Sequence, residues 1–201
     1  MRSCHPVRRL GLDLRCAAES IEMRAVIVYE SMFGNTRAIA RVIAEGVGPD
    51  VRVLGVAEAD AREAEGADLI IVGGPTHWSR MSRPSTRKSA LKAVRQPGSD
   101  LVLEPGADIG PGVREWLDTF DLFQARAAAF DTRYKASAAI FGRASKGIAR
   151  ALSHHGLTVM VSPESFLVDW KSHLLPGETD RARAWGAQLA TIVESQGAAR
   201  T

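Results

Sequence analysis

The sequence lacks most of the features that mark secreted, membrane or metal-binding proteins. Its 201 residues contain two cysteines, Cys4 and Cys16, with no histidine cluster of metal-ligand spacing beside them. We therefore expect neither a metal site nor a disulfide framework, and we expect reduced thiols in a cytoplasmic protein. No apolar run reaches the roughly 18 residues that a membrane helix needs, so no membrane span is predicted.

The common nucleotide-binding and hydrolase motifs are also missing. The chain contains no G-x-x-x-x-G-K-[ST] and no G-x-G-x-x-G segment. Ser165 is not flanked as a nucleophile elbow, and we assign no catalytic residue. Lysine and arginine total 26 against 23 acidic residues, for a net charge of +3. This small excess, without a basic stripe, argues against nucleic-acid binding.

The composition indicates one globular domain. Hydrophobic residues make up 45% of the chain and charged residues 24%, which is enough for a sizeable core. Residues 1–22 contain four arginines, both cysteines and no clear periodicity. We interpret them as a disordered extension or as the product of an upstream start codon, with Met23 as the true start. The domain is therefore predicted to span residues 23–201.

Apolar runs alternate with amphipathic segments from Met23 onward. Strands are predicted at 25–29, 51–56, 68–73, 127–130 and 157–161. Helices are predicted after Thr36 until Gly46, Gly48 and Pro49 end the run, and at 57–65, around 90–94, and at 113–120, 146–155 and 179–194. Five strands that alternate with helices predict an α/β fold with a doubly wound parallel sheet and helices on both faces.

The first strand leads into a loop suited to a phosphate. Ser31 and Thr36 carry hydroxyls, Asn35 an amide, and Gly34 a backbone that can approach a ligand closely. They lie where the first free N–H groups of a helix point at an anion, so a singly phosphorylated ligand could be held without lysine. The alternative is that these side chains only cap the helix.

The segment from Ile27 to Ala40 resembles the flavodoxin signature. In that signature, a strand ending in an aromatic residue leads to [ST]-x-x-G-x-T and a helix with alanine four residues after the threonine. The resemblance implies a flavodoxin-like fold of five strands and a loop that wraps the phosphate of FMN. The implied phosphate-loop residues are Ser31, Met32, Phe33, Gly34, Asn35 and Thr36.

A second strand ends in a loop that supports the first. The nearly continuous apolar run 68–73 is typical of a strand buried on both faces, and Pro75, Thr76, His77 and Trp78 follow it closely. Loops at the carboxyl ends of parallel strands can converge on one ligand. The resemblance places Thr76 near the polar edge of the isoalloxazine ring and His77 or Trp78 against a ring face. The alternative for Trp78 is an ordinary half-buried aromatic residue.

A third loop is predicted after the strand 127–130. It contains Asp131, Thr132, Arg133 and Tyr134. The resemblance implies that this loop closes over the second flavin face, with Tyr134 stacking and Asp131 and Thr132 bonding ring heteroatoms. Solvated turn residues would have the same composition.

Basic residues distinguish this chain from familiar flavodoxins, which are strongly acidic around the flavin. The residues expected to surround the flavin end with positive charge are Arg37, Arg80, Arg83, Arg87, Lys88 and Arg133. The resemblance implies an FMN-binding electron carrier that exchanges electrons with redox partner proteins. The alternatives are an FMN-dependent NAD(P)H:quinone oxidoreductase, whose partners are NAD(P)H and a quinone, and a flavodoxin-type porphyrinogen oxidase.

Overall fold

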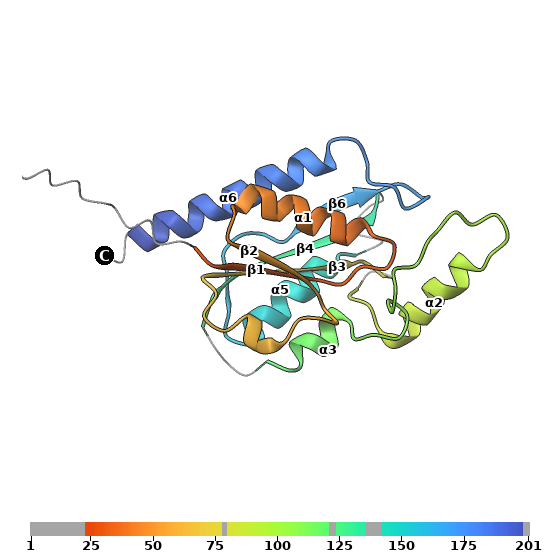
Figure 1. Cartoon of the computed structure of the whole chain (residues 1–201), viewed down its shortest axis with the longest axis horizontal. Coiled ribbons are helices and arrows are strands. Elements are labelled where there is room, and N and C mark those ends of the chain that lie inside the picture. The colour runs from red at the N-terminus through yellow and green to blue at the C-terminus, as the bar shows by residue number, and fades with distance from the viewer. Residues whose placement is uncertain (1–22, 78–79, 121–123, 136–141, 199–201) are drawn as a thin grey trace, which may run out of the picture.

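The computed structural model describes residues 23–77, 80–120, 124–135 and 142–198 (Figure 1). The predicted N-terminal segment 1–22 and the candidate ring contact Trp78 lie outside the described residues. Within the described part, no helix combines the length and the apolar character needed to cross a membrane.

A parallel sheet forms the centre of the domain, as predicted. Its strands are β1 (Ala25–Tyr29), β2 (Val51–Gly55), β3 (Leu69–Pro75), β4 (Arg126–Tyr134), β5 (Thr158–Val159) and β6 (Glu164–Val168). Their order is β2-β1-β3-β4-β5, and β6 pairs with the carboxyl-terminal half of β4. The inner strands β1 and β3 are apolar and almost entirely buried, as expected for strands covered on both faces.

Helices cover both faces of the sheet (Figure 1). The helices are α1 (Asn35–Val47), α2 (Pro84–Val94), α3 (Val113–Leu117), α5 (Ala144–His154) and α6 (Glu178–Ala198). One apolar core lies between the sheet and α1 with α6, and a second lies between the sheet and α3 with α5. This arrangement confirms the doubly wound architecture.

Glycines allow α1 and α6 to pack backbone against backbone. A Cβ atom on Gly46 would meet the carbonyl of Arg183, and one on Gly186 would meet the carbonyl of Ile43. α1 ends at Val47 with Gly48 as its C-cap residue, so the predicted end of the helix at Gly48 is confirmed, whereas Gly46 lies inside α1 rather than at its end. The close approach of the two helices, rather than chain termination, explains this glycine.

Four other boundary predictions were wrong. The segment 57–65 forms only a 3-10 turn at Ala61–Glu63, and α3 ends at Leu117 rather than Phe120. The strand expected at 157–161 is reduced to Thr158–Val159, and β6 follows it as an unpredicted sixth strand. Residues 131–134 are the end of β4 rather than a loop, because they pair with β6 on one side and partly with β3 on the other.

Candidate functional site

A cavity of about 450 Å³ lies where the carboxyl ends of β1, β3 and β4 meet. Ten of the fourteen predicted binding residues line it: Met32, Phe33, Asn35, Thr36, Pro75, Thr76, His77, Thr132, Arg133 and Tyr134. Ser31, Gly34 and Asp131 are among the described residues but do not line it. The structure thus brings all three predicted segments to one site, as the topology of parallel sheets requires.

The first loop leaves the start of α1 without a side-chain cap. Gly34 is the N-cap residue, with φ of 87°, and none of the side chains that the structure describes bonds the first N–H groups of the helix. The hydroxyl of Ser31 accepts the N–H of Gly34 at 3.1 Å, and the amide of Asn35 donates to the carbonyl of Ser172 at 2.6 Å. The capping alternative therefore does not describe this loop, and the free amides of α1 remain available to an anion.

Thr36 connects the first loop to β4. Its hydroxyl lies 2.7 Å from the hydroxyl of Thr132, and the two residues are only 2% and 6% exposed. Both also line the cavity. A hydroxyl pair of this kind fixes the rotamers of both threonines, and the hydroxyl that accepts within the pair keeps its own O–H free to donate to a ligand.

Thr76 and His77 form the adjoining wall at the end of β3. The N–H of Thr76 donates to the carbonyl of Thr132 at 2.9 Å, and its hydroxyl accepts the N–H of Ala144 at 2.9 Å. Burial, with a smaller contribution from the charge of Arg87, lowers the pKa of His77 below its ordinary value. His77 is therefore neutral at pH 7, and its buried Nε2 has no hydrogen-bond partner among the described residues.

Asp131 lies behind the cavity wall rather than in it. The residue is fully buried, and its Oδ2 accepts the N–H of Ser145 at 2.8 Å in the first turn of α5. Burial raises the pKa of Asp131, although the backbone N–H of Ser145 and the nearby hydroxyl groups oppose the rise. The carboxyl group thus occupies the amino end of α5 and supports Thr76 from behind.

One wall of the cavity was missed by the sequence analysis. It comes from α2, from the segment after it and from the end of β6: Thr86, Ser89, Ala90, Ala93, Leu101, Val168 and Ser172. The α2 residues recur at three- and four-residue spacing and are all small, so they make one smooth helix face. The spacing of these residues, directly after the second predicted loop, was the sequence signal for this wall. Small side chains do not by themselves indicate a binding role, so the signal was missed.

A buried polar cluster anchors α2 to the rest of the domain. Arg87 is 4% exposed, and its Nη1 donates to Ser82 and to Glu115, each at 3.1 Å. Glu30, also 4% exposed, accepts the N–H of Val113 at 3.0 Å, and burial raises its pKa. Arg87 was expected among the charges around the ligand; it does not line the cavity and bonds Ser82 and Glu115 instead, although its charge still acts on His77.

The other predicted cations have different environments. Arg37 pairs with Glu104 at 2.8 Å, which neutralises part of its charge. Arg80, Arg83 and Lys88 are exposed, and Arg133 lines the cavity while its Nη1 donates to the carbonyl of Tyr134. Arg133 is therefore the one of these predicted cations that the structure places at the cavity wall.

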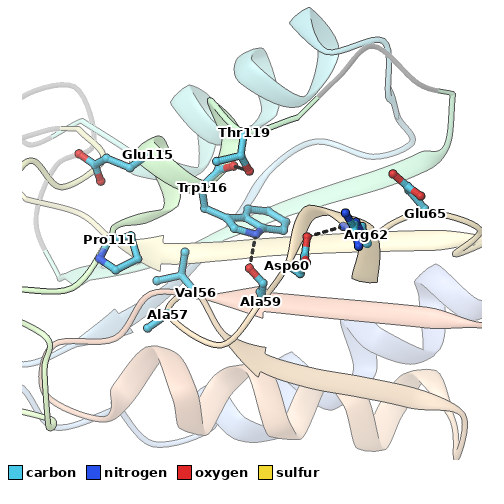
Figure 2. Close-up of a pocket in the computed structure, with 10 residues that line it drawn as sticks. All are labelled: Val56, Ala57, Ala59, Asp60, Arg62, Glu65, Pro111, Glu115, Trp116 and Thr119. Atoms are coloured by element: carbon cyan, nitrogen blue, oxygen red, sulfur yellow. Dashed lines mark hydrogen bonds between the residues drawn. The ribbon is translucent and has the colours of Figure 1, made fainter.

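A second cavity of about 500 Å³ lies between the 56–65 segment and α3 (Figure 2). Figure 2 shows the indole of Trp116 on its floor, where Nε1 donates to the carbonyl of Ala59 at 3.0 Å. None of the predicted binding residues lines this cavity. Three acidic side chains and one basic side chain line it, and residues 56–65 supply most of the lining. The candidate site is therefore the cavity at the strand ends, where the predicted residues meet. Among the described ranges, no group of three His, Cys, Asp or Glu residues could hold a metal ion.

No protein-family model matches the chain, and no curated protein matches it in sequence. Its structure is similar to that of a flavodoxin from the domain Archaea, with a TM-score of 0.57 and 22% identity over 86% of this chain and 99% of the other. Flavodoxin 1 from Bacillus cereus has a TM-score of 0.56 and 20% identity, over 84% of this chain and 97% of the other. A flavodoxin, WrbA-like protein from Agrobacterium tumefaciens has a TM-score of 0.54 and 18% identity, over 86% of this chain and 98% of the other. The chain therefore has the flavodoxin-like fold, as its signature predicted.

Proposed function

We propose that the protein binds FMN in the cavity at the strand ends and acts as an electron-transfer protein. The observation that carries this proposal is the uncapped start of α1, which opens into the same cavity as the two other predicted segments. FMN supplies one- and two-electron redox chemistry when it is bound. The residues of the chain bind it, orient it and set the electrostatic field around it.

The phosphate would lie at the start of α1. The backbone N–H groups of residues 35 and 36 are the donors, together with the hydroxyl of Thr36. Ser31 contributes indirectly, because its bond to the N–H of Gly34 fixes the turn that aims these groups. The positive end of the helix dipole favours the phosphate dianion without any lysine in the loop.

The ring would lie between the wall of Pro75, Thr76 and His77 and the wall of Arg133 and Tyr134. Neutral His77 can accept or donate a hydrogen bond at its orphaned Nε2. Tyr134, at 48% exposure, can cover a ring face while its other face stays in solvent. The proposed binding residues thus include those predicted at the three strand ends, with Trp78 as a further candidate and Asp131 as support for Thr76.

The size of the cavity favours a carrier over a quinone reductase. A cavity of about 450 Å³ is towards the small end of the range of about 300–1,000 Å³ found for single drug-sized ligands. It accommodates one ligand of that size, whereas a reductase must also stack a nicotinamide or a quinone on the flavin.

The test combines flavin loading with redox titration. The purified protein should show a flavin absorption spectrum, and spectroelectrochemistry should resolve the addition of the first electron from that of the second. In a separate assay with a quinone present, the protein should not oxidise NADPH. Arg133→Gln should make the second electron harder to add, because a nearby cation favours the anionic reduced flavin by Coulomb attraction of about 1 kcal/mol in water. Rapid NADPH-dependent quinone turnover would instead establish the reductase, and absence of flavin binding would refute both.

A further inference from the structure

Two aromatic side chains are exposed where β4 and β6 end. Tyr134 is the last residue of β4 and is 48% exposed, and Trp170, two residues beyond β6, is 80% exposed. Tyr134 pairs with Val168, and Lys135 donates its N–H to the carbonyl of Val168 at 3.0 Å, so both segments leave the sheet together. Tryptophan is highly buried on average, and exposed aromatic residues are enriched at protein interfaces.

Cations surround these aromatic residues. We call residues 133–135 and 169–173 the β4–β6 tip. Lys135 and Lys171 in the tip are exposed, and the Nζ of Lys171 lies 5.1 Å from the centroid of the Trp170 ring. The acidic residue of the tip, Asp169, accepts the N–H groups of Lys171 at 2.8 Å and His173 at 2.9 Å. The tip thus carries three cationic side chains, Arg133, Lys135 and Lys171, against this one carboxylate, and its exposed surface is predominantly basic and aromatic.

The tip is also a wall of the candidate site. Arg133, Tyr134 and Ser172 line the cavity. The amide of Asn35, at the start of α1, donates to the carbonyl of Ser172 at 2.6 Å, which connects the tip to the phosphate loop. A protein bound to the tip would therefore lie one layer of side chains away from a ligand in the cavity.

We propose that the β4–β6 tip is the docking surface for an acidic redox partner protein, an inference that rests on the proposed function. Carboxylates on the partner complement Arg133, Lys135 and Lys171 and accelerate encounter by electrostatic steering. Trp170 and Tyr134 supply the apolar anchors of the interface, since aromatic and arginine residues carry most of the binding energy at such sites. One electron then passes between the two proteins, so that one redox centre is oxidised as the other is reduced.

The experiment measures binding of two redox probes of opposite charge. Plant-type [2Fe–2S] ferredoxin is the acidic probe and cytochrome c the basic one, each titrated calorimetrically at low and high salt into protein with and without FMN. We expect salt-sensitive binding of ferredoxin that Trp170→Ala and Lys171→Glu each weaken at least about fivefold. Arg150→Glu is the matched control, because it makes the same charge change at an exposed position on α5 and should have little effect.

Several outcomes would overturn the proposal. Equal weakening by the Lys171 and Arg150 variants would mean that net charge, not the tip, attracts the probe. Binding of cytochrome c as tight as that of ferredoxin would exclude an acidic partner. Trp170-dependent sedimentation with phosphatidylserine vesicles, without binding of ferredoxin, would assign the tip to a membrane surface. Tip-dependent ferredoxin binding by a protein that takes up no FMN would refute the proposed function and leave the docking surface standing.

Discussion

Replacement of Thr36 by alanine tests how the site holds a phosphate. The hydroxyl of Thr36 is buried, bonds Thr132 at 2.7 Å and faces the cavity, so alanine removes a donor that the phosphate would use. A hydrogen bond to a charged group contributes about 1.5–3 kcal/mol, which corresponds to a roughly 10- to 150-fold weaker affinity for FMN. Riboflavin lacks the phosphate and should bind with nearly unchanged affinity.

The assay is quenching of flavin fluorescence on titration with protein, performed with FMN and riboflavin in parallel. Thr36→Ser is the matched control, because it keeps the hydroxyl and should retain most of the preference for FMN. The unliganded alanine variant should also lose about 1–3 kcal/mol of stability, since Thr132 is left without its buried partner. If the affinities for FMN and riboflavin fall by the same factor, Thr36 serves only the fold of the loop and the phosphate does not lie at α1.

Two further predictions concern stability. Gly46→Ala should destabilise the protein by about 1–3 kcal/mol because the new Cβ meets the carbonyl of Arg183. Gly197 has open space around it, so Gly197→Ala should be neutral or stabilise the protein by up to about 1 kcal/mol. Urea unfolding of the two variants measures both effects. Burial raises the pKa of Asp131 in the folded protein. Protonated Asp131 therefore adds to the free energy of unfolding at pH values below 3.8, its ordinary pKa, and this contribution is lost as the pH rises through the higher folded pKa. The stability of Asp131→Asn relative to the wild type should therefore increase as the pH rises from 4 to 7. A difference in melting temperature that does not change with pH would contradict this.

Local sequence patterns predicted the parts of the site that lie at strand ends. The run from Ala25 to Thr36 and the run from Leu69 to His77 each contain a buried strand and its following loop within a few residues. Their apolar runs and turn residues predicted them without further information. Because parallel strands carry their loops to one edge, the convergence of the three segments also followed from the topology alone.

The remaining parts depend on long-range contacts, which no local pattern reports. Residues 131–134 have the composition of a turn, but β6 pairs with them and extends β4 to Tyr134. β6 itself follows Pro163 and contains Glu164 and Ser165, so its sequence indicates no strand. The bond from Asn35 to Ser172 joins positions 137 residues apart. Sequence therefore predicted which residues of each segment line the cavity better than it predicted the contacts that hold those segments in place.

The cluster around Arg87 bears on the choice between a carrier and an enzyme. Its guanidinium is buried and donates to Ser82 and to Glu115, whose side chain is 35% exposed. An opening motion of α2 would have to separate Arg87 from Ser82 and Glu115 and bring the buried guanidinium into solvent. A wall fixed so firmly suits a cofactor that stays in the cavity, whereas an enzyme must admit and release a substrate beside the flavin in every cycle. Electron exchange through the exposed β4–β6 tip needs no such opening, which agrees with the cavity volume of about 450 Å³ in favouring the carrier.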